Sequence, residues 1–376
     1  MIYLLAALLL GFLVTFLGTP YARRYLLASG IISIDQQKEG KPKLPASGGI
    51  VVLFGFMVSI TSYLAFSAFL DLPDIDMAVT FAALNSAVLI ALIGLLDDIH
   101  IDLGSFIQEE LDIDDDDIEI NEILEVERLP HQSIIDRFTG DFSGKDSDDV
   151  MRQGLGQVPK MLFVLPAVLP LMAVGAGSWT MHFPVIGAVN WGLVYPFILL
   201  PVGLFFVANV VNMLAGTNGL SAAMSLVAST ALGTFAYMNG DLEAALIAFS
   251  LSTALVAFLR YNFYPASILP GDSLTYLCGA AMFAAIVIGN MEKFAVFIFA
   301  PWFLEFFLKL RSRFRAHSWG ILQEDGTLKA QHRKNYSLTH PLMRRGFTEP
   351  QITLALAGME TLICVAGLIL FSAGII

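Results

Sequence analysis

The chain consists of long apolar blocks separated by short polar segments. Ten blocks of roughly 17 to 22 mainly apolar residues follow one another, and this is the length that an α-helix needs to cross the hydrocarbon core of a bilayer. The blocks lie at 2–19, 48–70, 78–96, 159–176, 190–208, 217–237, 242–260, 274–290, 292–310 and 351–375. The alternation of apolar and polar positions that a membrane β-barrel requires is not found in them. The pattern predicts an all-α, polytopic membrane protein of about ten transmembrane helices.

The basic residues predict how these helices are oriented. Block 2–19 has no basic start and no small-residue cleavage site, and its first cations, Arg23 and Arg24, follow it, so it reads as a retained helix with its N-terminus outside. The inner segments are then 20–47, 97–158, 209–216, 261–273 and 311–350. Of the 21 Lys and Arg, only Lys293 falls at an outer turn. This bias follows the positive-inside rule and predicts that both termini lie outside.

Composition agrees with a lipid environment and isolates one unusual segment. The chain is 56% hydrophobic and 14% charged, whereas soluble domains carry about 25% charged residues. Its net charge of −12 comes from segment 105–150, which holds 16 acidic and 3 basic residues. We therefore expect one transmembrane domain, 1–376, with an acidic inner insertion at 105–150 and a basic inner loop at 311–350. No nucleic-acid partner is expected.

Polar residues gather at the predicted inner ends of the helices. The middles of the blocks carry almost no charge, apart from Glu305. A transporter or lipid scramblase would place ionisable residues near the midplane of the bilayer. The distribution favours an enzyme whose site lies at the inner face, with a lipid transporter or scramblase as the rival class.

Three polar groups at these inner ends suggest a cation site. Asp97 and Asp98 are adjacent carboxylates that repel each other unless a cation joins them, although they can equally form a solvated helix end. Segment 209–220 carries the amides of Asn209, Asn212 and Asn218, with glycines that suit backbone contacts to an anion. In the following inner loop, 264–273, one carboxylate precedes the next helix, and it can serve either as a metal ligand or as a helix N-cap. This carboxylate is Asp272.

The basic loop 311–350 suggests recognition of a nucleotide diphosphate. Basic inner loops are expected from topology alone, but this one also carries two histidines and faces the acidic helix ends. The residues concerned are Arg311, Arg313, Arg315, His317, Lys334, His340, Arg344 and Arg345.

These groups, in this order, resemble the polyprenyl-phosphate N-acetylhexosamine-1-phosphate transferase superfamily over nearly the whole chain outside 105–150. Segment 214–220, Leu-Ala-Gly-Thr-Asn-Gly-Leu, is similar to the dolichyl-phosphate branch of archaea and eukaryotes. The tail 339–350 resembles the histidine motif of the bacterial branch, but only one of its three histidines is present. The resemblance implies a ten-helix membrane fold with a cytoplasmic Mg²⁺ site, with Mn²⁺ as an alternative metal.

The resemblance also implies roles for individual residues. Asn212 and Asp272 match metal-binding positions, and Lys160 matches a lysine that contacts the diphosphate. Asp97 and Asp98 match the catalytic acidic pair. Segment 35–49 is similar to the family's first inner loop, beside the nucleotide and phosphate sites. The expected substrate-binding residues are Lys38, Ser47, Gly48, Asn209, Asn218, Arg313, Arg315, His317 and His340.

The implied reaction is transfer of GlcNAc-1-phosphate from UDP-GlcNAc to a polyprenyl or dolichyl phosphate in the plasma membrane, with release of UMP. Another UDP-sugar, such as UDP-MurNAc-pentapeptide, remains an alternative. A phosphate monoester is largely dianionic at neutral pH and is itself a competent nucleophile, which favours direct attack. A two-step route with Asp98 as the nucleophile also stays open, as does a homodimeric assembly.

Overall fold

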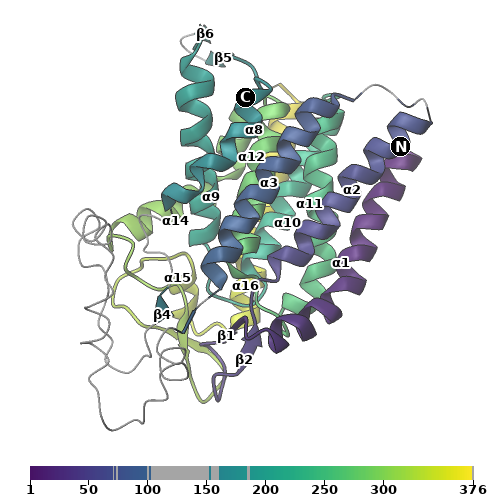
Figure 1. Cartoon of the computed structure of the whole chain (residues 1–376). Helices are drawn as coiled ribbons and strands as arrows, with labels where there is room; N and C mark the ends of the chain where they lie inside the picture. The colour runs from purple at the N-terminus through teal and green to yellow at the C-terminus, as the bar shows by residue number, and fades with distance from the viewer. Residues whose placement is uncertain are drawn as a thin grey trace, which may run out of the picture.

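The computed structural model describes residues 1–70, 72, 75–99, 101–102, 152–153, 161–183 and 187–374. In this part of the chain, eight helices are long and apolar enough to cross a membrane. They are α1 (Ile2–Ala28), α2 (Gly49–Phe69), α3 (Met77–Asp98), the segment Tyr195–Met213 that contains α9 (Leu200–Met213), α10 (Leu220–Met238), α11 (Leu242–Asn262), α12 (Gly271–Ile288) and α16 (Glu349–Ser372). Figure 1 shows them as one bundle, with the N-terminus on its outer edge.

Shorter elements complete the described chain. The helical ones are a 3₁₀ turn (Leu165–Val168), α8 (Leu169–Ala173), a π-helical turn (Tyr195–Leu199), α13 (Glu292–Ile298), α14 (Ala300–Leu310) and α15 (Thr339–Met343). The strands form four antiparallel pairs, β1 (Ile32–Ile34) with β2 (Lys43–Pro45), β3 (Ile101–Asp102) with β4 (Arg152–Gln153), β5 (Thr180–Phe183) with β6 (Gly187–Asn190), and β7 (Gly320–Leu322) with β8 (Leu328–Ala330). The mostly helical membrane fold is confirmed.

Two of the ten expected blocks differ from a single long helix. Block 292–310 is divided at Phe299 into α13 and α14, and Pro301 lies in the first turn of α14. Block 159–176 is described only from Met161 onward, as a shorter apolar helical stretch that ends at Ala173. Proline lacks the N–H that would continue the ladder of hydrogen bonds, so it favours the start of a new helix over continuation of the old one. The count of ten spans and the orientation stay predictions.

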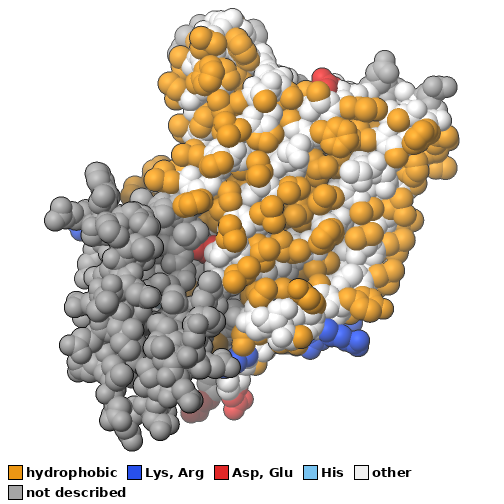
Figure 2. Space-filling model, viewed as in Figure 1, with side chains coloured by type: hydrophobic (Ala, Val, Ile, Leu, Met, Phe, Trp, Pro, Cys, Tyr) orange, Lys and Arg blue, Asp and Glu red, His pale blue; other side chains and the backbone are white. Residues whose placement is uncertain are grey.

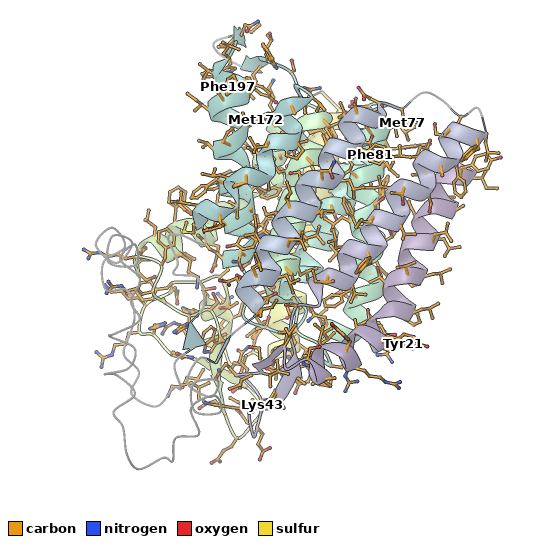
Figure 3. All side chains as sticks on the ribbon, viewed as in Figure 1. Tyr21, Lys43, Met77, Phe81, Met172 and Phe197 are labelled. Carbon is orange, nitrogen blue, oxygen red and sulfur yellow. The ribbon has the colours of Figure 1, made fainter. Side chains whose placement is uncertain are left out.

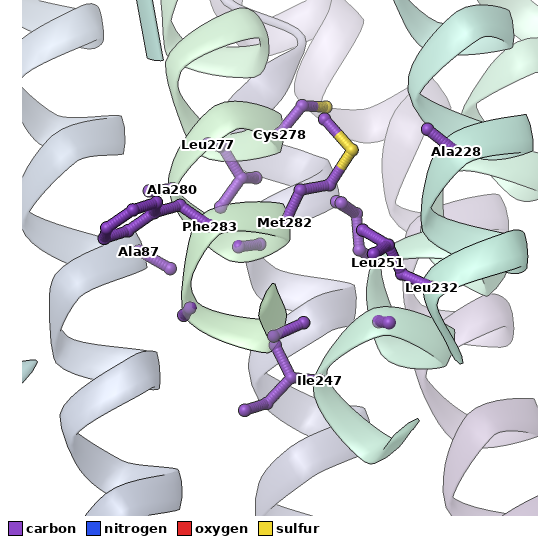
Figure 4. Close-up of a cluster of buried hydrophobic side chains, with 14 of the residues drawn as sticks. Ala87, Ala228, Leu232, Ile247, Leu251, Leu277, Cys278, Ala280, Met282 and Phe283 are labelled. Atoms are coloured by element: carbon purple, nitrogen blue, oxygen red, sulfur yellow. The ribbon is translucent and has the colours of Figure 1, made fainter. Parts of the chain in front are cut away.

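The helix α12 lies at the centre of the bundle. Of its apolar stretch 83% is buried, against 22% in α16. Figure 4 shows the packing around it, in which small and large apolar side chains from four helices interlock. These residues are Ala87 of α3, Ala228 and Leu232 of α10, Ile247 and Leu251 of α11, and Leu277, Cys278, Ala280, Met282 and Phe283 of α12.

The outside of the bundle is apolar, and charge is confined to its ends. In Figure 2, hydrophobic side chains cover the visible faces of the helices, while Lys and Arg lie at the lower edge. Figure 3 places Met77, Phe81 and Phe197 toward the opposite end from Tyr21 and Lys43. Exposed apolar side chains are stable in contact with lipid but not with water, so this surface is that of a membrane protein.

One buried carboxyl corrects the expectation that the middles of the blocks carry almost no charge apart from Glu305. Glu360 lies halfway along α16 with no exposed surface, and its Oε1 accepts a hydrogen bond from Cys364 Sγ at 3.2 Å. Glu305 is also fully buried, in α14. Several polar groups still meet at the helix ends that the sequence predicts to be inner.

We expect Gly94→Ala to destabilise the bundle. A Cβ at Gly94 would lie 2.6 Å from the carbonyl carbon and oxygen of Asp272, so α3 would have to move away from α12. Forcing a methyl group into such a contact costs about 1–3 kcal/mol, which thermal unfolding in detergent will detect as a lower Tm. Gly358→Ala in α16 is the matched control, because a Cβ there meets nothing within 4 Å. Equal Tm values for the two variants would contradict this account of the α3–α12 contact.

Candidate active site

The first turn of α12 is held by a carboxylate from another helix. Asp98, at the end of α3, accepts hydrogen bonds from the backbone N–H of Asp272 at 2.7 Å and of Ser273 at 3.2 Å, and from Ser47 Oγ at 2.6 Å. The first N–H groups of a helix have no partner inside it, and a negative charge there also interacts favourably with the helix dipole. Asp98 therefore caps α12 from outside.

The backbone at this point allows the close approach. Gly271 has φ +68°, and a Cβ there would lie 2.2 Å from Asp98 Oδ2. Asp272 is the second residue of α12, and the helix's own N-cap, Pro270, makes no side-chain cap. Asp272 is thus not the N-cap that the sequence left open as an alternative, and its carboxylate faces other groups.

The carboxylate of Asp272 meets the amide of Asn212. Asn212 Nδ2 lies 3.3 Å from Asp272 Oδ2, and Thr275 Oγ1 donates to Asn212 Oδ1 at 3.0 Å. Asp98, Asn212 and Asp272, from the ends of three helices, therefore converge as the sequence predicts. Asp97 precedes Asp98 in the sequence and is buried at the end of α3.

A pocket of about 370 Å³ opens next to this group. Its walls come from the end of α9, the turn that follows it, α14 and the loop before β7. They include four of the expected residues, Asn209, Asn212, Arg315 and His317. The other lining residues are Met161, Met213, Ala215, Gly216, Tyr276, Lys309, Phe314, Ala316, Ser318 and Trp319. His317 is exposed and stacks on Trp319, with ring centroids 4.0 Å apart.

Lys309 is a pocket residue that the sequence did not single out. Its Nζ donates to the carbonyl oxygen of Ala316 at 2.7 Å and lies 4.0 Å from Glu305 Oε1. Glu305 Oε2 in turn accepts the N–H of Leu338 at 2.7 Å. The spacing of four residues between Glu305 and Lys309 on one helix is the signal that predicts this pair.

Two expected substrate-binding residues belong to a buried ionic network. Lys38 Nζ forms ion pairs with Asp35, at 3.3 Å, and with Glu349, and it lies over the ring of Tyr264. Asn218 donates its backbone N–H to Glu349 Oε1 at 2.6 Å and its side-chain Nδ2 to Asp35 Oδ2 at 3.2 Å. Lys38 and Asn218 are therefore engaged within the protein and join the first inner loop to the start of α16.

Two further expected residues contact the loop before α12 and do not line the pocket. Ser47 is fully buried on Asp98, and the N–H of Gly48 donates to the carbonyl oxygen of Leu269 at 3.0 Å. A Cβ at Gly48 would lie 2.5 Å from the ring of Phe258. These residues place the first inner loop against the entrance of α12.

His340 is fully buried and uses both ring nitrogens. Nδ1 accepts the N–H of Tyr336 at 3.2 Å, so Nε2 carries the proton that it shares with the carbonyl oxygen of His317 at 3.0 Å. Burial, followed by the charges of Lys309, His332 and Arg344, lowers the pKa of His340 to about 4. The neutral ring therefore holds the backbone of His317 in place.

Two expected site residues remain, Arg313 and Lys160. Arg313 is exposed and is not among the residues that line the pocket. Lys160 and the insertion 105–150 lie outside the described residues, so their roles stay predictions.

The donor set at Asp272 and Asn212 suits a hard divalent cation. Within the described ranges, no group of three or more His, Cys, Asp or Glu side chains is placed to hold a metal. Mg²⁺ does not require one, because it is usually bound through one or two carboxylates together with water and substrate phosphates. Rotating the side-chain amide of Asn212 by half a turn exchanges the places of Oδ1 and Nδ2. Oδ1 then faces Asp272, and the Thr275 hydroxyl can accept a hydrogen bond from Nδ2.

Comparison with known proteins shows what the sequence of this chain is similar to. Residues 146–290 match the model of glycosyl transferase family 4. The chain is 28% identical to a protein of Sulfolobus acidocaldarius over 97% of this chain and 95% of that protein, and 29% identical to one of Saccharolobus solfataricus over 98% and 96%. Both are provisionally named UDP-N-acetylglucosamine–dolichyl-phosphate N-acetylglucosaminephosphotransferase. A phospho-N-acetylmuramoyl-pentapeptide-transferase of Clostridium perfringens is 30% identical over 38% of this chain and 44% of that protein.

We expect the stability of the protein to fall in mild acid through His340. Its folded pKa, about 4, lies below the ordinary value of 6.5, so the unfolded chain binds a proton more readily and stability is lost as pH falls from 6.5 toward 4. Between about pH 7.5 and pH 5, this group should remove about 1–2 kcal/mol. Thermal unfolding in detergent at both pH values checks this. His340→Gln cannot titrate there and should lose less Tm than the wild type, whereas an equal loss would contradict the assignment.

Proposed function

We propose that this chain, a member of glycosyl transferase family 4, transfers GlcNAc-1-phosphate from UDP-GlcNAc to dolichyl phosphate. The products are UMP and dolichyl-diphospho-GlcNAc. The observation that carries the proposal is the meeting of Asp98, Asp272 and Asn212 beside a pocket that is lined by cationic side chains. The two archaeal relatives, which match over nearly their full length, support the same substrates by their names.

The reaction joins two anions, so charge compensation is its main requirement. An oxygen of the acceptor phosphate attacks the β-phosphorus of the nucleotide sugar, and the bond from that phosphorus to the UMP oxygen breaks. Asp272 and Asn212 would hold a Mg²⁺ ion, which would supply positive charge against the negative charge that develops on the transferred group. Arg315 and His317 line the same pocket and supply hydrogen-bond donors to phosphate oxygens.

The two carboxylates at the end of α3 have different tasks in this proposal. Asp98 has its oxygens engaged by α12 and by Ser47, so it holds the metal-binding turn in position. Asp97, which matches the other position of the catalytic acidic pair, is assigned to orienting the acceptor phosphate. A covalent route through Asp98 would first have to break the three hydrogen bonds that it accepts, which favours direct attack.

The acceptor's isoprenoid has an apolar surface beside the site. The helices α9 and α14 pack through Phe206, whose ring is 5.2 Å from Phe303 and 5.4 Å from Phe306. Val202 on one helix and Phe307 on the other are exposed to lipid. Both helices end at the pocket, so a lipid tail along them brings its phosphate to Asn212 and Arg315. The site then faces the cytoplasm, at the inner face of the plasma membrane.

We expect Asp272→Asn to abolish the reaction without unfolding the protein. The amide keeps the shape of the side chain but loses the charge that binds a divalent cation, and loss of such a group typically lowers kcat by at least about a hundredfold. Release of UMP from UDP-GlcNAc, with added dolichyl phosphate and Mg²⁺, measures the effect. Asp325→Asn, at the exposed tip of the β7–β8 hairpin, is the matched control. Undiminished turnover by Asp272→Asn would refute the metal assignment.

The same assay identifies the donor sugar. UDP-GlcNAc, UDP-GalNAc and UDP-MurNAc-pentapeptide are compared at equal concentration, and UDP-GlcNAc is expected to be the preferred donor. A preference for the pentapeptide donor would transfer the protein to the activity named for the clostridial relative. No UMP from any donor would favour the rival class, a lipid transporter or scramblase.

A further inference from the structure

Gln37 is a buried amide that bridges two walls of the pocket. It lies in the first inner loop and is 4% exposed. Its Nε2 donates to the carbonyl oxygen of Gly216, in the turn after α9, and its Oε1 accepts the N–H of Gly320 at 2.9 Å, at the start of β7. Only this assignment of the two amide atoms pairs a donor with an acceptor on both sides.

The two walls touch at the point that Gln37 spans. Gly216 has φ +130°, and a Cβ there would lie 2.9 Å from the Cβ of Ser318. Both Gly216 and Ser318 line the pocket. The carbonyl oxygen of Ser318 is held in turn by Thr339 Oγ1 at 2.6 Å. A shift of either wall therefore changes the shape of the pocket directly.

The segment that presents Gln37 is itself fixed. Asp35 and Lys38, on either side of it, take part in the buried network with Asn218 and Glu349. The N–H of Asp35 also donates to the carbonyl oxygen of Pro42 at 3.0 Å, which closes the loop between β1 and β2. An amide on a segment that is fixed in this way can impose a separation on the two loops that it joins.

We propose that Gln37 is a positioning residue, which sets the distance between the 214–219 turn and the 316–320 loop and so prepares the pocket for the nucleotide diphosphate. It does not touch the reacting atoms in this proposal, and it acts through Gly216 and the backbone that carries His317. The inference rests on the proposed function for the identity of the ligand, but not for the existence of the bridge.

A split between KM and kcat tests this role. Gln37→Met keeps the length of the side chain and removes both hydrogen bonds, while Gln37→Asn keeps an amide that is too short to reach both walls. Each variant should raise KM for UDP-GlcNAc about tenfold, because one or two hydrogen bonds that preorganise the pocket are lost. The kcat value and the KM for dolichyl phosphate should stay within about twofold. Gln323→Met, at a half-buried glutamine after β7 that does not line the pocket, should match the wild type.

Hydrogen exchange gives a second measurement that needs no substrate. The backbone amides of 316–322 should exchange faster in Gln37→Met than in the wild type, because the N–H of Gly320 loses its acceptor. Unchanged exchange, or faster exchange with an unchanged KM, would overturn the proposal. A loss of kcat and of Tm without a rise in KM would also overturn it, since that result describes a purely structural residue. If Gln37→Met fails to fold, Gln37→Asn decides.

UMP release by the wild type tests the proposed function, and KM or UDP binding by Gln37→Met tests the role of Gln37. If the wild type releases no UMP from UDP-GlcNAc, the proposed function fails, and calorimetric titration with UDP then tests Gln37 alone. Weaker UDP binding by Gln37→Met, by about tenfold, would support the bridge, and equal binding would refute it. If the wild type is active and Gln37→Met keeps the wild-type KM, only the inference about Gln37 fails.

Discussion

The candidate site depends on the hydrogen bonds that Asp98 accepts from the first turn of α12. A carboxylate that caps a helix from outside satisfies donors that have no intrahelical partner and adds a charge–dipole attraction, together worth about 1–3 kcal/mol. For the site, the position that this contact gives to the start of α12 matters more than the energy of the contact. Asp98 ties the end of α3 to the start of α12, and this places the carboxylate of Asp272 against the amide of Asn212. The cap thus helps to fix the positions of the three helix ends relative to one another.

A second constraint is the balance of buried charge around the pocket. Lys38 is paired with Asp35 and Glu349, and Lys309 lies beside Glu305, so neither cation is buried alone. Buried ion pairs add little to stability, but removing one partner leaves an uncompensated charge and is costly. The pair of Lys38 with Glu349 joins the β1–β2 loop to the start of α16, whereas Glu305 and Lys309 lie on one helix. Arg315 and His317 are exposed polar groups of the pocket.

The expected site residues divide along the same line. Asn209, Asn212, Arg315 and His317 line the pocket, and Asp272 adjoins it through Asn212. Others that the sequence assigned to substrate contact other parts of the protein, and their role toward substrate stays a prediction. Lys38 and Asn218 are joined to Glu349, which is 311 residues from Lys38 in the chain, and His340 holds the backbone of His317. A polar residue in a loop near a site has the same sequence signature whether it binds a ligand or another loop. Only its partners distinguish the two roles.

The sequence by itself determined the environment of this protein and the ends of the helices at which its chemistry is gathered. Apolar length, basic asymmetry and the acids and amides at block ends are local properties, and lipid imposes them on each helix separately. The tertiary structure decided which ends meet, that Asp98 caps a helix while Asp272 faces Asn212, that Lys309 lines the pocket and that Gln37 bridges two of its walls. These outcomes depend on the packing of residues far apart in the chain, and no periodicity or spacing within one helix records which distant side chain will fill a given contact.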